Sequence, residues 1–126
     1  MALSKPQLAE KIKAVALLHG EFTLRSGKKS NYYLDKYLFG TRPEILKELV
    51  PFIVALLPAQ YDRLAGPELG AITLTTASAM AVNKPFVLVR KAAKEYGTSK
   101  AFEGEIKPGE KIVIIEDILT TGGAAL

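Results

Sequence analysis

The 126-residue sequence contains no cysteine and a single histidine, and its apolar runs are short. Without cysteine, the chain offers no disulfide, no thiolate nucleophile and no cysteine-based metal site. One histidine leaves little scope for imidazole catalysis or a histidine-rich metal cluster. No apolar stretch approaches the roughly 20 residues that span a bilayer, and the N-terminus has no signal-peptide core. A cytoplasmic location without a membrane partner is therefore expected.

The composition is that of a globular protein, with 48% hydrophobic and 24% charged residues. The length fits one domain. The net charge is +4, and the basic residues are scattered except in residues 25–29 and 84–100. Such clusters, separated by apolar strands, suit a compact anionic substrate at least as well as a nucleic-acid duplex. Composition alone does not decide between a small anionic substrate and a nucleic acid.

The most informative stretch is residues 111–123, which read KIVIIEDILTTGG. A β-branched run, then Glu116 and Asp117, then threonines and glycines predict a buried parallel strand, a loop and a helix start. Backbone N–H groups in such a loop suit a bound phosphate. The two carboxylates must serve another part of the ligand, either sugar hydroxyls or a Mg²⁺ ion.

This stretch resembles the phosphoribosyl-pyrophosphate signature of the type I phosphoribosyltransferases. It is neither a Walker loop nor a dinucleotide fingerprint, because Gly-Lys-Ser/Thr and Gly-x-Gly-x-x-Gly are both missing. An ordinary α/β strand with a polar turn is the plainer alternative. The resemblance implies an α/β fold with a parallel sheet flanked by helices. It also implies a single domain over residues 1–126, with an N-terminal hood over about 1–40 and a core over about 41–126.

Apolar periodicity predicts the remaining elements. Helices are expected over residues 5–18, 41–57 and 71–82, and further strands over 61–65 and 85–89. His19 and Gly20 should end the first helix, and Pro51 should kink or divide the second. In a parallel sheet, ligands gather beyond the carboxyl ends of the strands. The segments that follow the three strands should therefore face one crevice.

Residues 21–35, EFTLRSGKKSNYYLD, have the spacing of a surface hairpin. They also resemble the N-terminal hood of orotate phosphoribosyltransferases, where Phe-Thr-Leu-(Lys/Arg)-Ser-Gly leads to a Ser-x-Tyr/Phe-Tyr/Phe run. The resemblance implies that Arg25 reaches the diphosphate site of a neighbouring subunit. It also implies that Tyr33 and Leu34 lie against the orotate ring.

Residues 90–97, RKAAKEYG, are too basic for a core helix, and a solvated charge run is the plainer interpretation. They resemble the mobile basic loop of the orotate enzymes. By that resemblance Arg90, Lys94 and Tyr96 meet diphosphate, and Lys91 does so in the adjacent subunit's site. Tyr96 stands where the family usually has histidine, and it can donate a hydrogen bond but cannot carry positive charge.

The loop at residues 66–70 resembles the family's diphosphate loop. Leu69 and Gly70 occupy its ligand-contacting positions, so their contact must come from backbone N–H groups. The resemblance makes Lys94, Glu116 and Asp117 the catalytic residues. The remaining substrate-binding residues that it implies are Ile118, Leu119, Thr120, Thr121, Gly122, Gly123 and Ala124.

The implied activity is transfer of the 5-phosphoribosyl group from phosphoribosyl pyrophosphate to orotate, in pyrimidine synthesis, by a homodimer with shared sites. Mg²⁺ would lie near Glu116 and Asp117, held through substrate or water. Two alternatives stay open. One is a phosphoribosyltransferase for another base, and the other is a non-catalytic sensor of phosphoribosyl pyrophosphate that binds nucleic acid. Family members continue for several more elements, which include an arginine for the orotate carboxylate, so residues beyond Leu126 are expected.

Lys94→Ala tests the role implied for the basic loop. Loss of the cation that neutralises departing diphosphate should raise the activation free energy by roughly 3 kcal/mol and lower kcat accordingly. Removal of one preorganised donor has an effect of this size. Steady-state kinetics measure the change, and an unchanged kcat would contradict the assignment.

Overall fold

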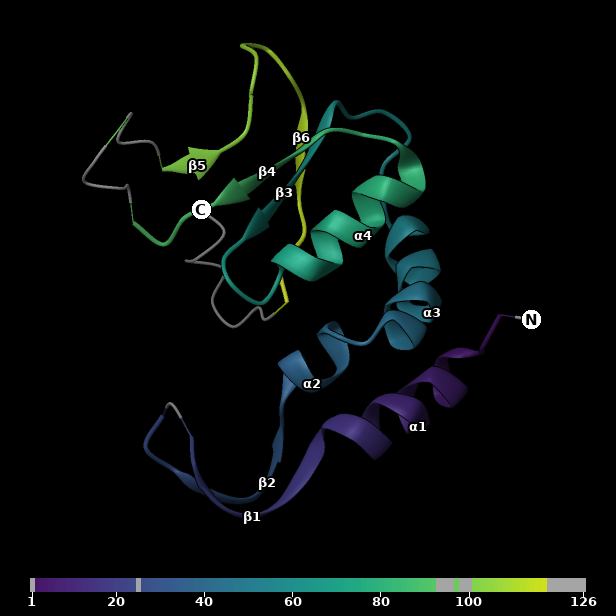
Figure 1. The fold of residues 1–126 in the computed structure, drawn as a ribbon, viewed down its shortest axis with the longest axis vertical. Coiled ribbons are helices and arrows are strands. Elements are labelled where there is room, and N and C mark those ends of the chain that lie inside the picture. Colours follow the sequence, from purple (N-terminus) through teal and green to yellow (C-terminus); the bar gives the residue numbers. More distant parts are fainter. Residues whose placement is uncertain (1, 25, 93–96, 98–100, 118–126) are drawn as a thin grey trace. The chain divides into compact units, whose positions relative to one another are not determined.

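The structure, a computed structural model, describes residues 2–24, 26–92, 97 and 101–117. The chain forms two compact units, residues 1–49 and residues 50–126 (Figure 1). No helix in the described part of the chain is long and apolar enough to cross a membrane.

The first unit begins with helix α1 (Lys5–Ala16). Its start is a capping box, in which the Gln7 N–H donates to Ser4 Oγ at 3.3 Å and the Ser4 N–H donates to Gln7 Oε1 at 2.9 Å. The predicted helix end was wrong, because the helix stops at Ala16. His19 lies in a strand and does not cap the helix. From Leu17 onwards, the backbone N–H and carbonyl groups pair with a second strand instead of continuing the helix.

That strand, β1 (Leu17–Thr23), forms an antiparallel hairpin with β2 (Lys29–Leu34). The rings of Phe22 and Tyr33 lie 5.6 Å apart between centroids and tie the two strands together. Helix α2 (Lys36–Gly40), which was not predicted, follows directly. Asp35 caps it by accepting a hydrogen bond from the Tyr37 N–H at 2.9 Å.

Helix α3 (Pro43–Val54) contains Pro51 and runs across the division between the two units. The sequence predicted that Pro51 would kink or divide this helix, but the helix continues through Pro51 without a division. The Ala55 N–H donates to the Pro51 carbonyl at 3.0 Å, so helical hydrogen bonding resumes immediately after the ring.

The second unit is built on a four-stranded sheet in the order β5-β4-β3-β6. The central strand β3 (Arg63–Pro67) pairs in parallel with β4 (Phe86–Val89) and with β6 (Ile112–Ile114). The predicted parallel strands are confirmed, although β3 begins two residues later than predicted. The edge strand β5 (Phe102–Glu103) is antiparallel to β4 and was not predicted.

Helix α4 (Ile72–Val82) packs on β3 and β4, close to its predicted bounds (Figure 1). The core between helix and sheet centres on three buried side chains, Leu64, Ala79 and Ile115. Packed against them are Ile53, Leu57, Tyr61, Leu74, Val82, Phe86 and Val113.

Gly66 allows β3 to approach α4 closely. A Cβ atom at position 66 would lie 2.4 Å from Thr75 Oγ1 and 2.7 Å from Thr75 Cβ. Thr75 is fully buried on α4, so it has little room to move aside. Only glycine fits this position without a shift of helix or strand.

Gly66→Ala should therefore destabilise the fold by about 1–3 kcal/mol through overpacking. The midpoint of denaturant unfolding measures the loss. Combining it with Thr75→Ala, which removes one of the two clashing atoms, should cost less than the sum of the single changes. A wild-type midpoint for Gly66→Ala would contradict the packing described.

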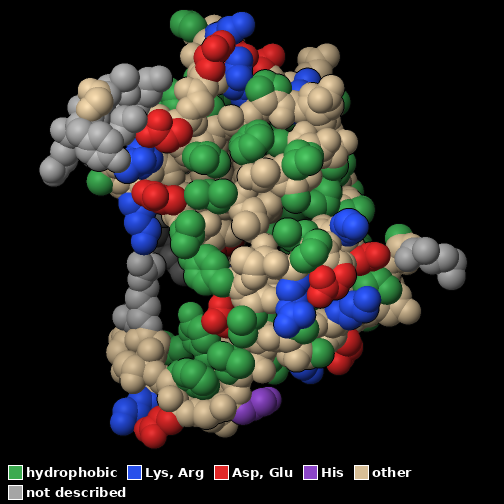
Figure 2. All heavy atoms as spheres, viewed as in Figure 1, with side chains coloured by type: hydrophobic (Ala, Val, Ile, Leu, Met, Phe, Trp, Pro, Cys, Tyr) green, Lys and Arg blue, Asp and Glu red, His purple; other side chains and the backbone are tan. Residues whose placement is uncertain are grey.

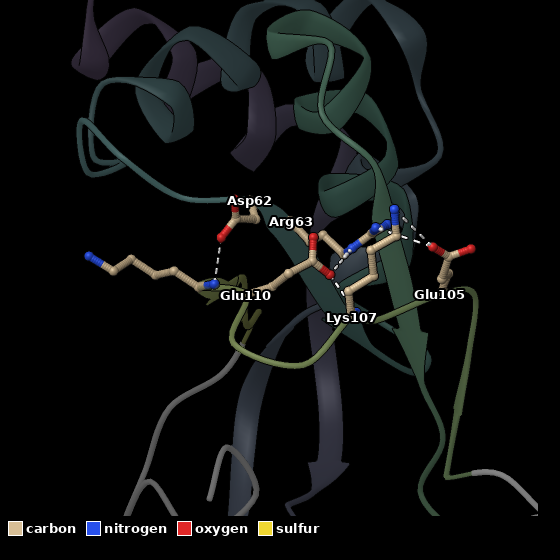
Figure 3. A network of polar contacts seen from close by, with 6 residues as sticks. Asp62, Arg63, Glu105, Lys107 and Glu110 are labelled. Carbon is tan, nitrogen blue, oxygen red and sulfur yellow. Dashed lines mark hydrogen bonds and ion pairs between the residues drawn. The ribbon is translucent and has the colours of Figure 1, made fainter.

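A polar network joins the amino ends of β3 and β6 (Figure 3). Arg63 Nε donates to Glu110 Oε1 at 2.6 Å, and Arg63 Nη2 lies 3.7 Å from Glu105 Oε1. The Asp62 N–H donates to the Lys111 carbonyl at 2.8 Å, and the Lys111 N–H donates to Asp62 Oδ2 at 2.7 Å. Main chain and side chains together hold the start of β6 against β3.

The pKa of Glu110 lies below its ordinary value because the Arg63 side chain and then the Lys107 N–H donate to its carboxylate. The folded pKa is thus lower than the unfolded one. Glu110 stabilises the fold above its ordinary pKa of 4.5, and that contribution is lost as pH falls through the folded value.

Glu110→Gln should accordingly lower the free energy of unfolding at pH 7, and its difference from wild type should shrink in acid. Denaturant unfolding over a pH series measures both. Glu10→Gln, at an exposed position on α1, is the charge-matched control. A difference for Glu110→Gln that stayed constant from pH 7 to acid would contradict the prediction.

Candidate active site

Three chain segments leave the parallel sheet at its carboxyl edge. Pro67, at the end of β3, is paired with Val89, at the end of β4. The Ile115 N–H, just past β6, donates to the Ala65 carbonyl at 2.9 Å. Because the carboxyl ends of parallel strands lie on one side of a sheet, the segments that follow them share this edge. The three predicted segments thus begin at one edge, and the crevice that they are expected to face stays a prediction.

The acidic pair lies directly beyond β6. Ile115 is buried in the core, and Glu116 and Asp117 after it are half-buried. The Asp117 N–H donates to Glu116 Oε1 at 3.0 Å, which holds the Glu116 carboxylate against the main chain at Asp117. The buried isoleucine therefore anchors a pair of carboxylates at the edge where ligands bind in such sheets.

The pair fits a Mg²⁺ ion that is held mainly by other oxygens. Mg²⁺ takes hard oxygen ligands and usually keeps several waters, binding through one or two carboxylates and substrate phosphates. Within residues 2–24, 26–92, 97 and 101–117, no group of three His, Cys, Asp or Glu side chains could hold a metal. Such an ion would lie near Glu116 and Asp117 and be held through water or a phosphorylated ligand.

The loop after β3 carries backbone donors to the same edge. The Glu68 N–H donates to the Val89 carbonyl at 2.8 Å, and the Glu68–Leu69 peptide bond is cis. Leu69 is exposed, and its apolar side chain cannot bind an anion. Helix α4 starts just afterwards, and its N-cap, Ala71, makes no side-chain cap hydrogen bond. First-turn N–H groups and the N–H groups of Leu69 and Gly70 are the anion donors that this loop offers.

The segment after β4 brings cations to the edge. The Arg90 N–H donates to the Ala101 carbonyl at 2.8 Å, and Arg90 Nη1 lies 3.4 Å from Glu103 Oε2. This ion pair is long and partly exposed, while Arg90 Nε is buried. The Lys91 N–H donates to the Glu68 carboxylate, and Lys91 itself is exposed.

Sequence reasoning missed Glu68 and Glu103, the two acids that hold the cationic segment. Glu68 had a signal, since it is an acid within a loop expected to bind an anion. Glu103 had none, because β5 contains two residues and shows no periodicity.

The structure thus brings six predicted site residues to one edge. They are Leu69, Gly70, Arg90, Lys91, Glu116 and Asp117. Tyr33 and Leu34 belong to β2 in the other unit, where their side chains are 45% and 47% exposed. The predicted residues outside the described part of the chain are Arg25, Lys94, Tyr96, Ile118, Leu119, Thr120, Thr121, Gly122, Gly123 and Ala124.

Charged side chains of both signs are interspersed on the face shown in Figure 2. Among the residues described there, Lys and Arg lie close to Asp and Glu and do not gather into one basic stripe.

A parallel sheet whose carboxyl edge carries a strand-end acidic pair, a backbone-donor loop and a cationic segment defines a type I phosphoribosyltransferase. In agreement, a solved structure of Mycobacterium tuberculosis orotate phosphoribosyltransferase with inorganic phosphate matches this fold with a TM-score of 0.76 and 29% identity. That match covers 94% of this chain and 67% of the other. No family model matches the chain.

Curated relatives narrow the class. The orotate phosphoribosyltransferase of Methanocella arvoryzae is 46% identical over 121 residues, which cover 95% of this chain and 69% of the relative. That of Methanocaldococcus jannaschii is 45% identical over 123 residues, which cover 97% and 70%. The chain belongs to the orotate phosphoribosyltransferase family, whose members are pentosyltransferases.

Proposed function

We propose that this chain forms the phosphoribosyl-pyrophosphate site of an enzyme that makes orotidine 5′-phosphate and diphosphate from orotate and that donor, with Mg²⁺. The strand order supports the proposal: Glu116 and Asp117 follow β6, the backbone-donor loop follows its neighbour β3, and Arg90 follows β4 on the other side of β3. Carboxylates suit sugar hydroxyls, and N–H groups and cations suit phosphates. A phosphorylated sugar carries both.

Glu116 and Asp117 accept hydrogen bonds from the ribose hydroxyls. A C–N bond forms between an orotate ring nitrogen and the anomeric carbon while the C–O bond to diphosphate breaks. Diphosphate takes the bonding electrons, and the proton of the ring nitrogen passes to the departing diphosphate or to water. Positive charge develops on the ribose ring in between. The half-buried carboxylates stabilise it, because preorganised charge acts strongly where water is excluded.

The leaving diphosphate needs donors on its far side. We assign that role to the N–H groups around Leu69 and Gly70 and to the guanidinium of Arg90. Mg²⁺, when bound, adds further neutralisation of the diphosphate charge. The protein therefore contributes position and charge, and the reaction needs little proton transfer from side chains.

We assign contact with the orotate ring to two residues of the hood. Tyr33 and Leu34 are exposed apolar side chains on β2, and such side chains suit the face of a flat base. A homodimer with shared sites, in which Arg25 and Lys91 serve the partner's diphosphate site, is proposed on the family resemblance. Residues 1–126, hood and core, then belong to a single phosphoribosyltransferase domain.

Loss of orotate ultraviolet absorbance on mixing with the donor and Mg²⁺ tests the activity, in protein whose expressed length is established by intact mass. Wild type should consume orotate. Asp117→Asn keeps the size of the side chain, removes its charge, and should lower turnover about 100-fold or more. Glu44→Gln, which alters an exposed acid in the other unit, should behave as wild type.

Two further measurements separate the alternatives. Calorimetry with the donor and Mg²⁺ should detect binding, and its absence would overturn the proposal. Binding of the donor without orotate consumption, together with a salt-dependent shift of DNA, would identify a regulator instead.

A further inference from the structure

Glu68 is an acid in the middle of a loop that the proposed function assigns to an anion. A free carboxylate at this place would repel diphosphate. The structure gives the carboxylate another role, because it accepts a hydrogen bond from the Lys91 N–H. Glu68 is half-buried, and the bond itself is exposed.

The backbone of Glu68 makes a second bond to the same neighbouring segment. Its N–H donates to the Val89 carbonyl at 2.8 Å, one residue beyond the last pair of the β3–β4 ladder, Pro67 with Val89. The side chain then holds the Lys91 N–H, two residues further on. Glu68 thus extends the parallel pairing past the point where the β3 backbone turns away into its loop.

The residue between these two contacts is Arg90. Its N–H donates to the Ala101 carbonyl at 2.8 Å, and its guanidinium lies 3.4 Å from Glu103. Ala101 and Glu103 therefore hold one side of the segment, and Glu68 holds the other. Without the Glu68 carboxylate, the main chain at Lys91 would lose its hydrogen bond to the loop after β3.

We propose that Glu68 is a positioning residue that couples the loop at residues 66–70 to the cationic segment at Arg90 and Lys91. The coupling lets the N–H donors of the loop and the guanidinium of Arg90 meet one anion together. The identity of that anion rests on the proposed function. The coupling itself is a property of the fold.

The test compares Glu68→Gln, which keeps an acceptor oxygen, with Glu68→Ala, which loses it. Glu10→Ala removes an exposed acid from α1 and is the charge control. The first measurement is amide hydrogen exchange at Lys91. Loss of a hydrogen bond to a charged acceptor should speed exchange about tenfold or more in Glu68→Ala. Exchange in Glu68→Gln and in the control should stay near wild type, as should exchange at core amides such as that of Leu64.

The second measurement is the affinity for inorganic diphosphate with Mg²⁺, by calorimetry on the same proteins. Glu68→Ala should bind several-fold more weakly than Glu68→Gln, although both lack the negative charge. If Glu68→Ala does not fold, Glu68→Met, which keeps the length and loses the acceptor, takes its place.

Wild-type exchange at Lys91 in the acceptor-free variant would overturn the coupling. Equal diphosphate affinities for the glutamine and acceptor-free variants would overturn it as well, since charge and not position would then govern binding. If wild type itself fails to bind diphosphate, the proposed function falls, and the exchange rates alone decide the coupling.

Discussion

The parallel pairing of β3 with β6 is the constraint on which the rest of the core depends. β6 contains three residues and contacts only one neighbouring strand among those described, so its register needs support from both ends. The Arg63 network supports the amino end, and burial of Ile115 and its bond to Ala65 support the carboxyl end. A slip of one residue would turn Ile115 to the other face and carry Glu116 with it. The interactions that fix the register of β6 therefore also fix the position of Glu116 at the site.

Acids and cations both follow the parallel strands at the carboxyl edge. The Asp117 N–H donates to the Glu116 carboxylate, and the Glu68 carboxylate accepts from the Lys91 N–H, while Lys91 itself is exposed. Arg90 forms a long, partly exposed ion pair with Glu103. Such an edge can bind a ligand that has hydroxyls at one end and phosphates at the other. That match between ligand and site is why membership of the orotate phosphoribosyltransferase family makes physical sense here.

Strong local signals were enough to predict most elements of the core. The β-branched run before Glu116 gave a strand, and the small apolar run of α4 gave a helix within one residue of its start. The hood was predicted less well. The end of α1 was wrong because Leu17 is a good helix former that pairs across the hairpin with Leu34. Propensity is a weak prior, and tertiary pairing overrode it.

The sequence by itself determined the kinds of chemical group available: an acidic pair at a strand end, a glycine loop and a basic segment. It determined their approximate order along a parallel sheet too, because apolar periodicity is local. Only the tertiary structure decided which partner each group has. Glu68 faces the backbone of Lys91, and Arg90 meets Glu103, through contacts between residues far apart in the chain. Such contacts leave no periodic trace, since they depend on strand order and register, which are set by packing over the whole sheet.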